Sequence, residues 1–319
     1  EIPSEHYHSH WLADRTIEWI DDREVDENWF CWLSFGDPHH PFQPPAEELH
    51  RVDWRDVPLP AGCPPDEATL QRVLESKPRH WLDFYNGTQY PATEIPRGFV
   101  PKELTHPQIR EINARVHVMN EVIDDAIGRV LRHLEARGEI EETHIVYCSD
   151  HGSMQGDCNL LFKGPFHVDS MMRVPLIWRP ARSAEIAPAE LWDPVSMVDL
   201  APSFFNIAGL TPGDWMEGAP LPTEAGRREA VFVEWNQDSP DAHIAIDTVV
   251  TRDHICSVYR LTRDYPDGGG ELYVSKDDPQ QWWNRWDDPA YAALRITLTD
   301  RVEAMKPVPG GVAPLYGYA

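Results

Sequence analysis

The chain has 319 residues, which corresponds to about two domains of ordinary size. Its 53 acidic and 28 basic residues leave a formal net charge of -25, which makes nucleic acid and anionic membrane surfaces unsuitable partners for the chain as a whole. Hydrophobic residues make up 41% of the sequence, and no apolar run approaches the roughly 20 residues of a membrane-spanning helix. We therefore expect a folded globular protein in which a small anionic ligand would need a local cationic pocket or a metal ion.

The N-terminal part of the chain predicts a short helix followed by a buried strand. Residues 11–20 have the partly apolar spacing of a helix. Residues 29–35 (WFCWLSF) form a continuous apolar run that ends at Gly36, which is typical of a strand buried on both faces in a parallel sheet. Residues 41–101 are rich in proline, tryptophan and charge, and we expect them to be mostly loop, as a lid or a substrate wall.

The middle of the chain alternates helices and strands. A capping box at 105–108 opens a run of apolar residues spaced by three and four, which predicts a long helix ending near Gly138. Apolar runs at 144–148 and 174–178 predict two further buried strands, and residues 195–208 predict another amphipathic helix. This order is typical of an α/β fold with a mainly parallel sheet.

The pattern changes after residue 226. Four short apolar segments separated by turn residues predict an antiparallel sheet; they are 231–235, 244–251, 255–261 and 271–274. Residues 288–305 predict a terminal helix. We therefore divide the chain into residues 1–225, a partial α/β domain whose mainly parallel sheet is sandwiched by helices, and residues 226–319, a smaller antiparallel β subdomain with a terminal helix.

The five cysteines are widely spaced and include no CxxC pair, which argues against a disulfide framework and against a cysteine-based zinc site. Cys31 and Cys148 lie in apolar runs, and we expect both to be buried thiols. Histidines alternate at positions 6, 8 and 10 and could hold a transition metal, but a polar entry into the first helix is the simpler interpretation.

Two loops that follow predicted strands carry chemically complementary residues. One contains His39, and the other contains Asp150, His151 and Lys163. If both strands belong to one parallel sheet, the loops open at the edge where α/β proteins bind ligands. Asp150 and His151 offer an oxygen and a nitrogen to a divalent metal ion. Lys163 offers a charge to an anionic oxygen, and His39 can be an acid, a base or a hydrogen-bond donor, so together they suit hydrolysis of a sulfate or phosphate ester.

Each of these residues alone has an ordinary structural explanation. An Asp–His pair at a strand end can cap the next helix, histidines before a proline can be turn residues, and a lysine in a Gly–Pro loop can simply be solvated. The combination, and not any single residue, indicates a site.

Several segments resemble the sulfatase family of the alkaline phosphatase superfamily and stand in that family's order. They are FGDPHHPFQPP at 35–45, SDHG at 149–152, KGPFH at 163–167, RVPLIWRP at 173–180 and SMVDLAPSFFNIAGL at 196–210. GGELYVSKDDP near the C-terminus is similar to the family's C-terminal subdomain. The SDHG form favours the branch that contains choline-sulfatase-like enzymes and phosphonate monoester hydrolases.

The resemblance implies an alkaline-phosphatase-like fold and hydrolysis of a sulfate monoester, with phosphonate monoesters or phosphodiesters as the alternative substrates. It implies that Asp150 and His151 ligate one divalent cation, calcium in the first place, with manganese or magnesium as alternatives. Lys163 would bind an ester oxygen and stabilise developing charge, and His39 would contact the leaving-group oxygen. His167 is a further candidate for the wall of the substrate pocket.

The chain also departs from the family pattern. The family nucleophile is a formylglycine made from cysteine in a CxPSR or CxAxR motif, and no cysteine here lies in such a motif; Cys256 has only the spacing to Arg260. Asp21 and Asp22 match the family's paired metal ligands in letters, but no strand precedes them, and we expect a solvated helix end. We therefore expect a C-terminal portion of a sulfatase, active only in a full-length parent whose N-terminal part supplies the formylglycine.

An inactive truncated fragment that binds a metal ion or a partner is the alternative of another class. For the enzyme, we expect a small-molecule sulfate or phosphonate ester as the partner, with no nucleic acid and no membrane. A homo-oligomer is compatible with the sequence, and a cytoplasmic location is the provisional expectation.

Overall fold

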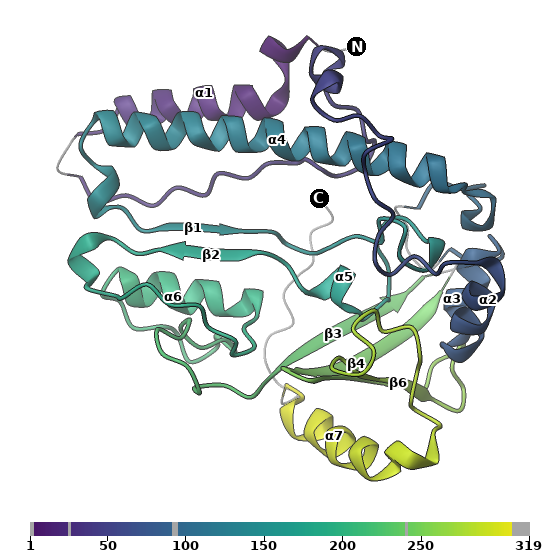
Figure 1. The fold of residues 1–319 in the computed structure, drawn as a ribbon. Helices are drawn as coiled ribbons and strands as arrows, with labels where there is room; N and C mark the ends of the chain where they lie inside the picture. The colour runs from purple at the N-terminus through teal and green to yellow at the C-terminus, as the bar shows by residue number, and fades with distance from the viewer. Residues whose placement is uncertain (1–2, 25–26, 91–94, 240–241, 308–319) are drawn as a thin grey trace.

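In the computed structural model, which describes residues 3–24, 27–90, 95–239 and 242–307, two long helices lie side by side above a pair of strands, and a four-stranded sheet with a C-terminal helix lies below them (Figure 1). The helices are α1 (His8–Asp21), α2 (Glu67–Ser76), α3 (Arg79–Tyr85), α4 (His106–Ala136), α5 (Asp169–Met172), α6 (Leu200–Ile207) and α7 (Ala292–Met305). The strands are β1 (Ile145–Cys148), β2 (Leu176–Arg179), β3 (Ala230–Asp238), β4 (His243–Thr251), β5 (His254–Tyr259) and β6 (Gly269–Val274). Among the described helices, none combines the length and apolar character that crossing a membrane requires.

Helix α4 forms as its sequence predicts. The hydroxyl of Thr105 accepts from the backbone N–H of Gln108, and the Gln108 side chain accepts from the backbone N–H of Thr105, which completes the capping box. Gly138 follows the helix with φ at +75°, a left-handed conformation that favours glycine. Ala13 of α1 and Ala126 of α4 are fully buried where the two helices pack, so small side chains let them approach closely.

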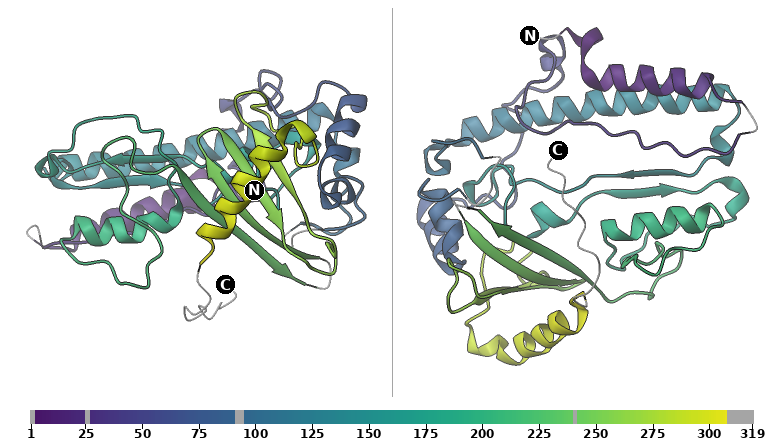
Figure 2. Two further views of the ribbon diagram at one scale, coloured as in Figure 1. Left: turned by 90° about the horizontal axis from the view of Figure 1, so that it is seen from below. Right: turned by 180° about the vertical axis from the view of Figure 1, so that it is seen from behind.

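Residues 29–35 do not form the strand that their apolar run predicts. They are extended and run between α4 and β1 (Figures 1 and 2), but within the described structure no strand pairing is assigned to them. Their burial alternates: Trp29 and Phe35 pack against the α1–α4 layer, while Phe30 and Trp32 are each 61% exposed. The prediction was wrong because an apolar run does not by itself show that both of its faces are covered.

Strands β1 and β2 are antiparallel, which differs from the parallel arrangement that we expected between them. Residues 149–175 connect β1 to β2 and consist of loop with short helical turns such as α5. They contain no long crossover helix, which a parallel pair of strands would need. Tyr147 and Ile177 are cross-strand partners, and both are exposed. One face of this strand pair is therefore open.

The segment 41–101 contains two helices where we expected mostly loop. Helix α2 is capped by Asp66, whose carboxylate accepts a backbone N–H of the first turn. Val73 and Leu74 of α2 and Trp81 of α3 are fully buried in the largest apolar cluster. The prolines of this segment lie outside the helices. Their high number led to the prediction of loop, although the residues between them have the apolar spacing of a helix.

The C-terminal sheet is antiparallel in the order β3-β4-β5-β6, and α7 follows it, as predicted. Helix α7 covers one face of the sheet, where Leu298 packs against Cys256 and Val302 against Val249 (Figure 2). The opposite face belongs to the largest apolar cluster through Tyr273. The sheet thus lies between α7 and the loops that follow β1. The division of the chain between residues 225 and 226 stays a prediction.

The described structure holds all five cysteines as free thiols, in agreement with the expectation that there is no disulfide framework. Cys31 and Cys148 are only half-buried, so the expectation that both are buried thiols was wrong. Both lie in segments with one open face, next to exposed positions such as Trp32 and Tyr147. The buried thiols are instead those of Cys158 and Cys256.

A buried polar network joins the end of α2 to the inner face of the sheet. The ammonium group of Lys77 donates to the hydroxyl of Tyr273 at 2.8 Å and to the carbonyl of Gln281 at 2.7 Å. The Tyr273 hydroxyl donates in turn to Glu271, which also accepts from Tyr259. Burial lowers the pKa of Lys77 and raises the pKa of Glu271, because each charge has lost its water.

Candidate functional site

The two loops singled out from the sequence meet at Lys163. Its ammonium nitrogen lies 3.0 Å from Nε2 of His151 and 3.5 Å from Nε2 of His39. His39 precedes Lys163 by 124 positions, so the fold, and not local sequence, makes this contact. The structure therefore brings together His39, His151 and Lys163, while their chemical roles stay predictions.

Both histidine rings are held in the same tautomer. Nδ1 of His39 lies 2.7 Å from the carbonyl oxygen of His40, and Nδ1 of His151 lies 2.8 Å from that of Gly152. A carbonyl oxygen can only accept, so each Nδ1 carries a hydrogen and each neutral ring offers a lone pair at Nε2. Lys163 donates toward both lone pairs.

Asp150 lies next to His151 with its carboxylate open to solvent. Its side chain is 82% exposed, and its Oδ2 lies 3.4 Å from Nε2 of His151. Its other oxygen accepts the backbone N–H of His151 at 2.8 Å, which fixes the direction of the carboxylate. A carboxylate oxygen and an imidazole nitrogen thus face the same point.

Asp150 and His151 fit one side of a divalent-cation site. A separation of 3.4 Å between their donor atoms suits two neighbouring ligands of an ion with bonds of about 2.4 Å. The bond from Nδ1 of His151 to the Gly152 carbonyl orients the ring as in many metal-ligating histidines. Within the described ranges, however, no group of three or more His, Cys, Asp or Glu side chains could hold a metal ion. These residues therefore supply only part of a complete coordination shell.

Gly152 is required by the packing of the loop that carries Asp150 and His151. A Cβ atom at this position would lie 1.9 Å from the carbonyl oxygen of Ser170, which is a severe clash with backbone. The Gly152 N–H donates to the carbonyl of Met171 at 2.7 Å, so this loop lies directly on α5. Any side chain at Gly152 would move the proposed metal ligands.

His167 contacts the C-terminal sheet. Its Nδ1 lies 2.6 Å from the hydroxyl of Thr248, and that hydroxyl donates to Ser257 at 2.8 Å, so His167 is the donor to Thr248. The ring is buried, and burial lowers the pKa of His167 to about 4. These contacts support a structural role, and a place for His167 in the substrate pocket stays a prediction.

His80 of α3, which we did not single out from the sequence, holds the loop that contains Lys163. Its Nε2 lies 3.0 Å from the carbonyl oxygen of Pro165, and its Nδ1 lies 2.6 Å from the hydroxyl of Tyr265. Nε2 must therefore carry the hydrogen, and Nδ1 accepts from Tyr265. Burial lowers the pKa of His80 to about 3, so the ring stays neutral. No local signal marks this residue, because its partners are 85 and 185 positions away.

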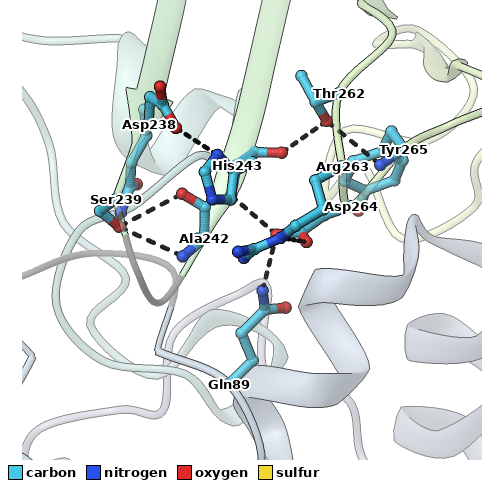
Figure 3. Close-up of polar contacts among 10 residues, drawn as sticks. Gln89, Asp238, Ser239, Ala242, His243, Thr262, Arg263, Asp264 and Tyr265 are labelled. Carbon is cyan, nitrogen blue, oxygen red and sulfur yellow. Dashed lines mark hydrogen bonds and ion pairs between the residues drawn. The ribbon is translucent and has the colours of Figure 1, made fainter.

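The loop that carries Tyr265 is itself fixed by hydrogen bonds (Figure 3). The backbone N–H of Tyr265 donates to Thr262, whose hydroxyl donates to the carbonyl of His243 at 2.6 Å. Asp264 accepts from the His243 N–H at 2.8 Å and from the amide of Gln89 at 3.2 Å. The sheet and the segment after α3 thus hold Tyr265 where it meets His80.

Comparison with known proteins gives consistent matches. The family model described as Sulfatase matches residues 2–210. The uncharacterized sulfatase YidJ of Escherichia coli (strain K12) is 28% identical over 298 residues, which are 92% of this chain and 54% of that protein. The choline-sulfatase of Rhizobium meliloti (strain 1021) is 25% identical over 302 residues, which are 91% of this chain and 53% of that protein. The chain thus spans about half the length of these curated relatives.

Among solved structures, the phosphonate monoester hydrolase of Agrobacterium radiobacter has a TM-score of 0.80 to this chain at 22% sequence identity. The match covers 95% of this chain and 61% of that one. It confirms the expected alkaline-phosphatase-like fold with its smaller antiparallel subdomain and terminal helix.

Proposed function

Because this chain belongs to the sulfatase family, we propose that it forms the ester-binding part of a hydrolase that acts on sulfate monoesters. The observation that carries the proposal is the ammonium group of Lys163 between Nε2 of His39 and Nε2 of His151. The exposed carboxylate of Asp150 lies beside this group. Hydrolysis of an anionic ester needs groups of this kind at one point: a cation, oriented imidazoles and a carboxylate.

Lys163 binds the charged end of the ester in this proposal. An ammonium group has three donors, and two of them point toward ring nitrogens in the structure. A sulfate oxygen is a better acceptor for a cation than a neutral ring, so the substrate would take one of these bonds. The same contact would stabilise the negative charge that develops during hydrolysis.

His39 serves the leaving group. Because its Nδ1–H is committed to the His40 carbonyl, only Nε2 can hold or release a proton to the substrate. The neutral ring accepts at this atom, and the protonated ring donates there to the leaving-group oxygen. The hydrogen bond at Nδ1 keeps the ring plane fixed in both states.

Asp150 and His151 would hold a divalent cation, and we propose calcium, with manganese or magnesium as alternatives. When bound, the ion would polarise the ester as a Lewis acid. We place the formylglycine nucleophile outside these 319 residues. Cys256, which alone has the spacing to a following arginine, is fully buried under α7, and burial raises the pKa of its thiol to about 11.

Activity of the full-length protein on an aryl sulfate tests the proposal. Lys163→Met should reduce turnover about a hundredfold or more, which is the usual effect of removing one preorganised donor to a developing charge. Lys102→Met, at an exposed position in the short 3-10 helix Pro101–Glu103, is the matched control and should leave turnover unchanged. Normal turnover of the Lys163 variant would contradict the proposed role.

Hydrolysis of a phosphonate monoester or a phosphodiester is the second candidate, because the fold is shared with a phosphonate monoester hydrolase. Both anions need the same cationic groups, so parallel assays of the full-length protein on an aryl sulfate and an aryl phosphonate decide between them. A thousandfold preference for the phosphonate would overturn the first choice. An absence of both activities in the full-length protein would favour the alternative in which the chain binds a metal ion or a partner and catalyses no reaction.

A further inference from the structure

A row of aromatic rings begins at His39 and leads away from it. His39 stacks on His40, with ring centroids 4.2 Å apart and an angle of 28° between the planes. His40 meets Phe162 edge to face at 4.9 Å. Phe162 is parallel to Phe42, at 7° and 6.2 Å, and edge-on to Phe99 at 5.2 Å. We call His40, Phe42, Phe99 and Phe162 the aromatic wall.

The aromatic wall lies between the core and the surface. All four of its side chains are half-buried. Phe99 and Phe162 pack on one side against the largest apolar cluster, whereas Phe166, four positions after Phe162, is fully buried inside that cluster. The aromatic wall therefore leaves apolar ring surface accessible next to a cationic site, which is where a ligand with an apolar part gains most from contact.

The backbone fixes the position of the Phe162 ring. Its φ is +71°, in the left-handed region that a bulky residue rarely adopts. The carbonyl of Phe162 accepts from the N–H of Met154 at 2.8 Å, and the preceding Leu160 and Leu161 are buried. The loop is thus anchored before Phe162, and the ring is preorganised directly next to Lys163.

We propose that the aromatic wall binds the leaving group and that the substrates are esters of aromatic or other flat apolar alcohols. This inference rests on the proposed function, because it places the charged end of the ester at Lys163. The order of groups in the protein is Lys163, His39, His40 and Phe162. The order of groups in an aryl ester is the same: the charged sulfate, the bridging oxygen and the ring.

A sugar ester fits the aromatic wall less well. Sugar hydroxyl groups need several donors and acceptors, and a site that buries them without partners weakens binding. Phe42, Phe99 and Phe162 have no polar atoms in their side chains, so only His40 could meet a hydroxyl group. The composition of the wall therefore favours a flat apolar leaving group.

Two stable anions, benzenesulfonate and methanesulfonate, test the inference with the full-length protein in a ligand-observed NMR titration. Both should occupy Lys163, and benzenesulfonate should bind about tenfold more tightly, because its ring buries apolar area against Phe162. Phe162→Leu should reduce this preference to about twofold without changing the affinity for methanesulfonate. Phe162→Tyr should keep the preference. Phe204→Leu, at a half-buried ring of α6, is the matched control and should change neither affinity.

The outcomes distinguish a failure of the aromatic wall from a failure of the anion site at Lys163. Equal affinities of the two anions for the unaltered chain, or an undiminished preference in Phe162→Leu, would overturn the aromatic wall and leave the anion site at Lys163 intact. Failure of both anions to bind, or equal binding to Lys163→Met, would overturn the proposed function and this inference with it. If Phe162→Leu does not fold, Phe42→Leu is the second variant, with the same expected loss of preference.

Discussion

Nζ of Lys163 lies 3.0 Å from Nε2 of His151, on the lone pair through which that ring would bind a metal ion. The other ring nitrogen is committed to the Gly152 carbonyl, so Nε2 is the one acceptor atom of the His151 ring. Lys163 and a cation would therefore compete for a single atom. If an ion were bound there, the ammonium group would turn to another acceptor, and in the proposed function that acceptor is the substrate.

Replacing Lys163 should strengthen metal binding while it weakens anion binding. Lys163→Met removes both a competing donor and a positive charge from the point that Asp150 and His151 face, so we expect roughly tenfold tighter binding of Mn²⁺. Titration of the chain followed by electron paramagnetic resonance measures this affinity. Lys102→Met is the control for a general change in charge. Weaker Mn²⁺ binding in the Lys163 variant would show that the two cations do not compete.

Removing the two proposed ligands should abolish the metal site. Asp150→Asn combined with His151→Ala should eliminate activity of the full-length protein and lower its metal content to background, because a carboxylate and an imidazole are lost together. Metal analysis after dialysis and thermal unfolding would separate loss of the ion from loss of the fold. A variant that retains stoichiometric metal and normal turnover would rule out these ligands.

The buried pair of Lys77 and Glu271 makes a testable stability contribution. Lys77→Met should lower the free energy of unfolding by about 3–5 kcal/mol, because Glu271 would then be buried without a cation. Adding Glu271→Gln should recover part of the loss, since the unpaired charge is then gone. Urea unfolding of the two single variants and the double variant gives the coupling energy. Strictly additive effects would show that the Tyr273 bridge does not couple the two charges.

Acid should destabilise the protein through His167. The folded ring has its pKa lowered to about 4 by burial, whereas the unfolded ring has a pKa of about 6.5. Below about pH 6.5 the unfolded chain binds a proton that the folded chain does not, so this contribution to stability is present at higher pH and is lost as pH falls toward 4.

In His167→Asn, which keeps a donor near Thr248, stability should depend less steeply on pH between 6.5 and 4. The difference in slope should approach about 1.4 kcal/mol per pH unit at most. Urea unfolding at several pH values in this window measures the slope for both proteins. Identical slopes would mean that His167 is already protonated in the folded protein.

Secondary structure that depends on local sequence signals was predicted correctly. Burial and contacts that depend on residues far apart in the sequence were missed. The capping box and apolar stripe of α4 are local, and both were confirmed. Residues 29–35 were expected to be a buried strand, but whether Phe30 and Trp32 are covered depends on what lies opposite them in the fold. The meeting of His39 with Lys163 was predicted from two strands of one parallel sheet, but residues 29–35 are not a strand in the described structure, so the two residues meet without that sheet edge. His80 could not be identified, because both of its partners are remote in sequence.

The open face around β1 and β2 should make the isolated chain self-associate. Tyr147 and Ile177 of this face are exposed. Phe30 and Trp32 of the segment before Gly36 are also exposed, although both contact the ring of Phe204 in α6, and single domains seldom leave so many large apolar side chains uncovered. Sedimentation velocity should detect dimers or larger species, and Phe30→Ser with Trp32→Ser should shift the population toward monomer. A monodisperse monomer of the unaltered chain at high concentration would contradict this prediction.

The hydrogen bonds from Tyr265 to His80 and from His80 to the carbonyl of Pro165 reach the backbone two residues beyond Lys163. A directed-evolution library confined to residues near the ester would therefore omit positions that control where the ammonium group sits. In a selection that covers the whole chain, we would expect substitutions in the loop between β5 and β6 to appear as changes in rate, although this loop lies about a hundred residues further along the chain than Lys163. For redesign of the proposed hydrolase, that loop should be treated together with the site at Lys163.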